Sequence, residues 1–269
     1  GHPLPVTVKQ RLLLIIPGAL FLVALAAFEF GLRKGRETAP AVAVDAGPKL
    51  LSDEALVQTL AEQDLDERRL AFQSLLPPAT GYEIIPFTVG EPGAPETLAA
   101  ITQAAGTALL AHNSAASPVR GLSRINEASR HFEDTLRETL DAMPDFSCSI
   151  PTTAEGKEQR SGYPDLRIEH LPSKTVTYLD PKIFAEESRN ATLRTFYFEP
   201  QKGTSKVTEE AHHLLLGISH DGKDGEWTFL EWDLIDLASL QVRLKAEFQA
   251  SNRDLYRDST RVASSSDGR

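Results

Sequence analysis

An amphipathic helix pattern followed by three strand patterns constrains the fold of this 269-residue chain more than any other feature. Apolar residues recur at helical spacing from Leu122 to Met143, and Pro144 ends the pattern. Short apolar segments typical of strands follow at 146–150, 165–170 and 175–183. A helix that leads into strands separated by polar loops predicts an α/β domain, in which helices flank a central mixed sheet.

The remaining segments extend this prediction in both directions. Further strands are expected at 194–199, 213–219 and 227–232, and further helices at 52–76, 95–112 and 238–249. The first of these helices is expected to stop at Pro77-Pro78, since proline removes a backbone donor.

Changes in composition along the chain predict five parts. They are an N-terminal apolar segment (1–36), a linker (37–50), a small helical region (51–120), the α/β domain (121–257) and a loose polar tail (258–269).

One apolar run lies near the N-terminus. Leu12 to Phe28 carries no charge, and as a helix it would extend about 25 Å, or about 30 Å when continued to Leu32 past Glu29. We expect a membrane anchor through residues 12–32, with the basic residues that follow keeping the C-terminal part of the chain cytoplasmic. Two alternatives stay open: a signal segment cleaved on export to the periplasm or beyond, and a buried soluble helix.

The charge balance restricts the kinds of function. With 28 basic and 38 acidic residues, the formal net charge of −10 argues against a protein that coats nucleic acid through its overall charge. The single cysteine, Cys148, excludes a disulfide scaffold and a multi-cysteine zinc site. The adjacent His212 and His213 lie on a strand pattern and should point to opposite faces, so we do not expect them to bind one metal together.

Two acidic residues stand at the ends of neighbouring strand patterns. Pro164-Asp165 begins one strand, and Asp180-Pro181-Lys182 lies within the next. Carboxylates brought together at one sheet end repel each other unless a cation lies between them, and Mg²⁺ or Mn²⁺ prefers such oxygen ligands. Lys182 shares a strand face with Asp180, where its ammonium can orient water or stabilise charge on a phosphate.

The preceding helix supplies a third acid. Projected at 100° per residue, Glu133 lies at the edge of the apolar stripe, whereas Glu127 and Glu138 face solvent. Glu133 is therefore the acid on this helix that is best placed to reach a metal at the sheet.

Glu133, Pro164-Asp165 and Asp180-Pro181-Lys182, in this order of helix and strands, resemble the core of the PD-(D/E)XK nuclease superfamily. The segments RTFYFEP (194–200), HHLLLGISHD (212–221) and EFQASNRDLY (247–256) are similar to type II restriction-endonuclease-like members. The resemblance covers 121–256.

This resemblance implies a restriction-endonuclease-like fold and a DNA endonuclease. It further implies that Asp165, Asp180 and Glu133 bind Mg²⁺ or Mn²⁺, that Lys182 assists the attack of water, and that a homodimer forms. Pro181 departs from the usual pattern and predicts a bend or bulge in its strand.

Two other functions fit the same residues. A non-catalytic, membrane-associated binding module would keep the nuclease-like fold, and a phosphatase would use the same carboxylates on a smaller ester. Cleavage assays and metal titration separate these functions from a DNA endonuclease.

Overall fold

The computed structural model describes residues 51–65, 67–192, 194–201 and 203–263, and the account below concerns the compact unit Val57–Arg269 within those ranges. The apolar run at 12–28 lies outside the described residues. Among the described residues, no helix is long and apolar enough to cross a membrane.

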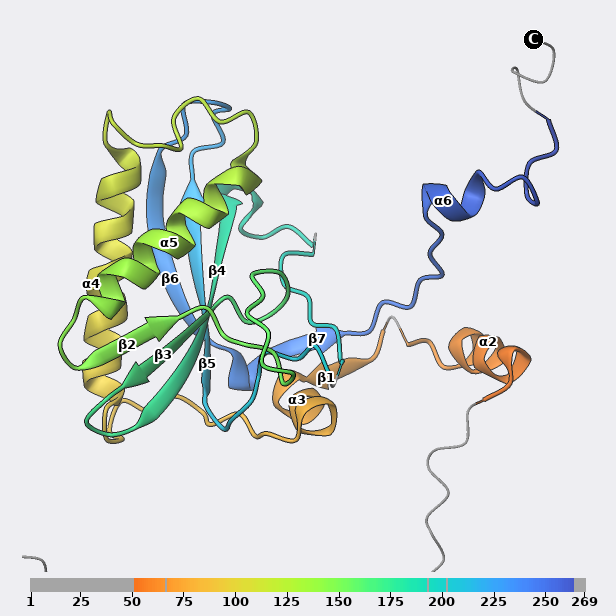
Figure 1. Ribbon diagram of the computed structural model, residues 1–269, viewed down its shortest axis with the longest axis horizontal. Coiled ribbons are helices and arrows are strands. Elements are labelled where there is room, and N and C mark those ends of the chain that lie inside the picture. The colour runs from red at the N-terminus through yellow and green to blue at the C-terminus, as the bar shows by residue number, and fades with distance from the viewer. Residues whose placement is uncertain (1–50, 66, 193, 202, 264–269) are drawn as a thin grey trace, which may run out of the picture. The chain divides into compact units, whose positions relative to one another are not determined.

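A five-stranded mixed sheet forms the centre of the fold (Figure 1). Its order is β2 (Phe146–Ser149), β3 (Leu166–His170), β4 (Thr175–Ala185), β5 (His212–His220) and β6 (Phe229–Asp236). The β4–β5 pair is parallel, and the other pairs are antiparallel. The predicted α/β class with a central mixed sheet is therefore confirmed for this part of the chain.

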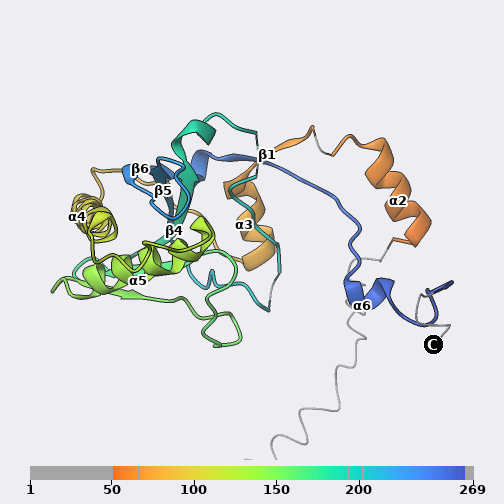
Figure 2. The same ribbon diagram turned by 90° about the horizontal axis from the view of Figure 1, so that it is seen from above.

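Helices cover both faces of this sheet (Figure 2). On one face lie α4 (Ala94–Asn113) and α5 (Ala128–Asp141), which pack Ile101, Phe132 and Leu136 against the strands. On the other lies α3 (Phe72–Thr80), whose Phe72 and Leu76 join a second core cluster with Tyr178. The short helices η1 (Ile125–Glu127), η2 (Glu186–Ser188) and η3 (Leu237–Ser239) make connections, and α2 (Asp53–Glu62) and α6 (Asn252–Leu255) complete the helices.

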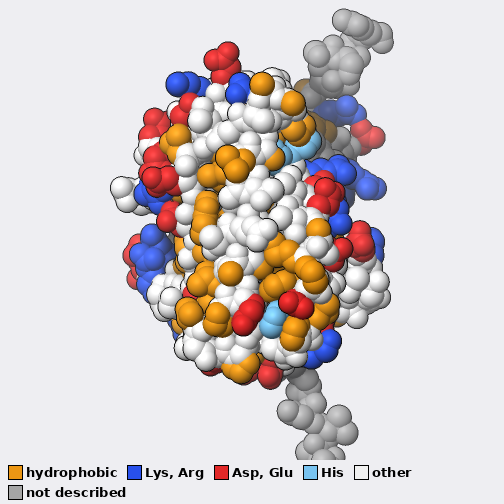
Figure 3. Space-filling model, turned by 90° about the vertical axis from the view of Figure 1, so that its left-hand side faces the viewer, with side chains coloured by type: hydrophobic (Ala, Val, Ile, Leu, Met, Phe, Trp, Pro, Cys, Tyr) orange, Lys and Arg blue, Asp and Glu red, His pale blue; other side chains and the backbone are white. Residues whose placement is uncertain are grey.

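The outer face of α4 is poor in charge. The helix contains one acidic residue, Glu96, and neither Lys nor Arg. In Figure 3, which looks onto this side, charged side chains gather mainly at the margins.

Three local predictions were wrong. The expected helix 52–76 is divided into α2, the strand β1 (Arg69–Ala71) and α3, and Pro77 and Pro78 lie inside α3. The helix tolerates them because Gln73 and Ser74, four residues earlier, are exposed, so water can satisfy the carbonyls that lose a donor.

The segments 194–199 and 238–249 also differ from expectation. The first adopts no strand in its described residues, although Phe196 and Phe198 pack against Phe72. The second forms η3 and the strand β7 (Gln241–Arg243), which pairs with β1. Tertiary pairing overrides the helical pattern there, because β1 offers a ladder partner for β7.

Phe72 should contribute strongly to stability. Its ring is fully buried and makes edge-to-face contacts with Tyr163, Phe196 and Phe198. We expect Phe72→Ala to lower the free energy of unfolding by about 3–5 kcal/mol, because it leaves a cavity between α3 and these segments. Urea denaturation measures the change. Phe248→Ala, at a ring that is 78% exposed, is the control, and an equal loss in both variants would contradict this role of Phe72.

Candidate active site

Neighbouring strands position the two aspartates. Asp165 immediately precedes β3, and Asp180 and Lys182 lie within β4. The last pair of the antiparallel β3–β4 register is Leu166 with Leu179, so its continuation places Asp165 opposite Asp180. The register thus brings to one sheet end the two acids that the sequence placed on separate strands.

The Lys182 ammonium contacts both carboxylates. Its Nζ lies 2.5 Å from Asp180 Oδ2 and 3.4 Å from Asp165 Oδ2. The Asp180 side chain is only 3% exposed, and that of Lys182 is 23% exposed. The three groups therefore form one compact, largely buried charge cluster.

Burial and mutual repulsion set the protonation of this cluster. Burial, and then the charge of Asp165, raises the pKa of Asp180. Burial would lower the pKa of Lys182, but the charges of Asp180 and Asp165 outweigh that effect and raise it above its ordinary value. The ammonium is therefore charged, and it balances the repulsion between the two carboxylates.

The donor set fits a hard divalent cation. Asp180 Oδ2 is buried, and its short contact is the 2.5 Å ion pair with Lys182. Two carboxylates that share one cation are the kind of ligands that Mg²⁺ or Mn²⁺ accepts. Within the described residues, however, no three His, Cys, Asp or Glu side chains are already arranged to hold a metal ion.

Glu133 lies at the side of this cluster. Its carboxylate forms a 3.7 Å ion pair with Arg160, which also binds Asp134 at 2.7 Å. Burial raises the pKa of Glu133 to about 7, and the charge of Asp165 adds to the effect, while Arg160 and Lys182 oppose it. Glu133 is therefore within electrostatic reach of Asp165 and Lys182, but its direct partner is Arg160.

Pro181 sits within β4 without a register shift, since the pairing of β4 with β5 continues from Thr177 to Ala185. The expected bulge is absent from this ladder. Pro181 lies beyond the last β3–β4 pair, so one side of β4 has no ladder partner there. A residue without an N–H is tolerated at such a position.

The half-buried Tyr163, two residues before Asp165, pairs with the buried His213. Tyr163 Oη and His213 Nδ1 are 2.6 Å apart, and their rings stack. Burial lowers the pKa of His213 to about 3, so its imidazole is neutral. The neighbouring His212 instead bonds Ile85 O through Nδ1 at 2.9 Å. The pair links the segment before Asp165 to β5, and only the position of Tyr163 beside Pro164-Asp165 could have suggested it.

Lys206 is a second lysine near the acids. It is 1% exposed, and its Nζ lies 3.3 Å from the Arg160 carbonyl oxygen. Burial lowers the pKa of Lys206, while Asp165, Asp180 and Glu133 oppose that shift. No sequence pattern separates Lys206 from the surface lysines, because its burial depends on how two loops pack together.

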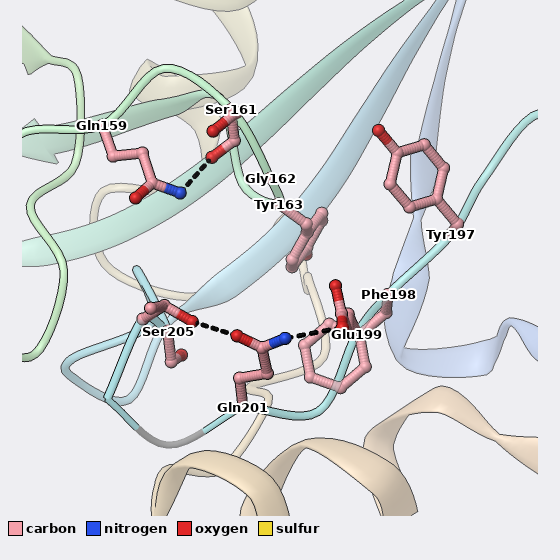
Figure 4. Close-up of a pocket in the computed structure, with 10 residues that line it drawn as sticks. Gln159, Ser161, Gly162, Tyr163, Tyr197, Phe198, Glu199, Gln201 and Ser205 are labelled. Carbon is pink, nitrogen blue, oxygen red and sulfur yellow. Dashed lines mark hydrogen bonds between the residues drawn. The ribbon is translucent and has the colours of Figure 1, made fainter. Parts of the chain in front are cut away.

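Two hollows adjoin the cluster. One, of about 280 Å³, lies between 159–163 and 197–205; in Figure 4 Gln159 bonds Ser161 and Gln201 bonds Glu199 at its edge. The other, of about 270 Å³, is lined by Lys182, Thr195, Phe196 and neighbouring residues of β4–β6. Lys182 is therefore accessible from the surface although Asp180 is not.

Glu133 should make the stability of the metal-free protein depend on pH. Its folded pKa of about 7 exceeds the ordinary 4.5, so the folded state binds more protons than the unfolded state between these values. As pH rises from about 4.5 to 7, wild type should lose of order 2 kcal/mol relative to Glu133→Gln, because Gln stays neutral. Urea denaturation in EDTA measures this. Glu138→Gln, on the exposed face of α5, should show no such trend, and a constant difference between wild type and Glu133→Gln would contradict the assignment.

Comparison with known proteins indicates a family for this chain. The model of the type II restriction enzyme MjaV family matches residues 65–259, which includes the whole central sheet and every residue of the charge cluster. Type II restriction enzyme MjaV of Methanocaldococcus jannaschii is 28% identical over 200 residues, covering 70% of this chain and 86% of the relative. No solved structure matches. The chain therefore belongs to the type II restriction enzyme MjaV family.

Proposed function

We propose that this protein is a divalent-metal-dependent DNA endonuclease of the PD-(D/E)XK type, with Asp165, Asp180 and Lys182 at its active site. The observation that carries the proposal is the contact of one lysine ammonium with two carboxylates where the β3–β4 ladder ends. Family membership supports DNA as the substrate, and type II restriction enzymes generally use divalent metals such as Mg²⁺.

Asp165 and Asp180 are the proposed ligands of Mg²⁺ or Mn²⁺, and Glu133 is the proposed third acid. When bound, the ion would supply positive charge that polarises a phosphate oxygen and lowers the pKa of bound water. Raised pKa values keep Asp180 and Glu133 partly protonated near neutral pH, so ion binding would compete with protons.

Lys182 has two roles in this proposal. In the metal-free protein its ammonium neutralises the two carboxylates. In the substrate complex its Nζ orients the attacking water and stabilises the negative charge that develops on the phosphate as the phosphorus–oxygen bond to the sugar breaks. The hollow beside Lys182 gives a phosphate access to this ammonium.

Tyr163 and Lys206 hold the surrounding segments in this proposal. The hydrogen bond from Tyr163 to His213 fastens the chain just before Asp165, and Lys206 binds the loop of Arg160, whose guanidinium pairs with Glu133. Attachment to a membrane through residues 12–32 and assembly into a homodimer stay predictions.

Substitutions in the charge cluster should abolish cleavage. Incubating the full chain and MgCl₂ with a large viral genomic DNA, on which a short recognition sequence recurs, tests the activity by electrophoresis. We expect Asp180→Asn and Lys182→Ala to reduce the cleavage rate at least about 100-fold, because each removes charge that the transition state needs. EDTA should abolish cleavage by wild type.

Lys174→Ala is the matched control, since Lys174 is 72% exposed in the β3–β4 turn and pairs with Glu169. It should cleave at the wild-type rate. Undiminished cleavage by both Asp180→Asn and Lys182→Ala would remove these residues from the mechanism. Metal-dependent unfolding shifts without any DNA cleavage would favour a binding module instead.

A further inference from the structure

Three arginines on one surface form no ion pair, whereas seven other arginines in the described ranges do. Arg68, Arg120, Arg124 and Arg253 likewise form none there. In the described ranges, ion pairs form at Arg130, Arg137, Arg160, Arg167, Arg189, Arg257 and Arg261. Arg69, Arg194 and Arg243 form no ion pair with any described residue. In a chain of net charge −10, carboxylates are abundant, so a group of unpaired arginines points to a partner outside the protein.

The two-stranded β1–β7 ribbon brings two of these arginines together. Arg69 is directly opposite Arg243, and the next pair is Leu70 with Val242. The alternation turns Leu70 and Val242 toward the protein and leaves both arginines exposed. Like charges directly opposite on an antiparallel pair are destabilising, and a bound anion would relieve that repulsion.

Arg194 and Tyr197 form the next part of the surface. The guanidinium lies 5.3 Å from the centre of the Tyr197 ring, which is 59% exposed. An arginine held flat against an aromatic ring keeps its fork of donors available for phosphate oxygens. This arrangement therefore presents a pre-oriented cation to solvent.

A hollow of about 250 Å³ joins these elements. Arg194, Tyr197, Arg243 and Lys245 line it, together with apolar residues that include Leu70 and Val242. Lys245 pairs with Glu247, whose pKa Arg194 also helps to lower. Arg69 and Arg243 have no ion-pair partner in the described residues, so their positive charge is not neutralised within the protein.

This surface continues into the active site through one segment. Phe196 lines both this hollow and the hollow that contains Lys182, and Thr195 lines the latter. Tyr197 and Tyr163 also border the hollow of about 280 Å³ that lies between 159–163 and 197–205 (Figure 4). The hollow lined by Arg194 and Arg243 and the hollow lined by Lys182 are therefore neighbours on either side of Phe196.

We propose that Arg69, Arg194 and Arg243 bind the phosphate backbone of DNA beside the cleaved bond, and so hold the duplex against the active site. The proposal rests on the proposed endonuclease function. These contacts position DNA without reading its sequence, because phosphates are the same at every base pair. The acidic remainder of the protein limits nonspecific binding elsewhere.

The salt dependence of DNA binding tests the proposal. Binding of the full chain to a labelled duplex of about 30 base pairs and mixed sequence is followed by fluorescence anisotropy in EDTA, in an Asp180→Asn background that prevents cleavage. Adding Arg69→Gln, Arg194→Gln and Arg243→Gln should weaken binding at least about tenfold near 0.1 M KCl. The plot of log K for DNA binding against the logarithm of salt concentration should become less steep by about 2–3, since each phosphate contact contributes about 0.9 to the steepness.

Activity gives a second readout. In the wild-type background, the three substitutions should lower kcat/KM for DNA while leaving kcat at saturating DNA and the cleavage sequence unchanged. The free energy of unfolding should not decrease, because the Arg69–Arg243 repulsion is removed.

Arg120→Gln is the control for each single substitution at Arg69, Arg194 or Arg243, because it also removes one charge, from an arginine that bonds the Asn113 and Ser114 carbonyls on another loop. Its binding and salt slope should equal those of the parent. An unchanged affinity in the triple variant, or a loss in Arg120→Gln equal to that in each single variant, would overturn the arginine surface alone if wild type cleaves DNA. A wild-type protein that neither binds nor cleaves DNA would overturn both proposals.

Discussion

The contact of the Lys182 ammonium with Asp165 and Asp180 is the interaction on which the rest of this site depends. Asp180 is almost fully buried, and two carboxylates this close repel each other strongly in a medium of low dielectric constant. A cation has to stand beside them for both to be charged. In the metal-free structure Lys182 is that cation, so the protein keeps its acids together before any ion binds.

The surrounding segments hold this unfavourable arrangement in place. Tyr163 bonds His213 on β5, Arg160 bridges two acids of α5, and Lys206 binds the Arg160 backbone. The first two contacts join a loop to a strand or a helix, and the third joins two loops. Burial, and then the charge of Asp165, raises the pKa of Asp180 and of Glu133, and perturbed pKa values of this kind cluster at functional sites.

The distribution of charge matters more for this protein than its sum. A net charge of −10 by itself argues against nucleic acid as a partner, yet the chain belongs to a family of restriction enzymes. Much of the positive charge is neutralised within the protein, as at Arg167 with Glu209 and Arg189 with Asp233. Arg69 and Arg243 of the β1–β7 ribbon form no ion pair in the described residues, so the local charge there can be positive although the net charge is negative.

The sequence alone determined the α/β class, because the helical period from Leu122 to Met143 and the apolar strands after it leave few other ways to bury a core. It also placed Asp165, Asp180 and Lys182 on neighbouring strands. Only the tertiary structure decided that one ammonium contacts both acids, since this depends on register between β3 and β4. The β1–β7 pairing, the two prolines inside α3 and the burial of Lys206 were likewise decided by contacts between segments far apart in the chain, which local patterns do not encode.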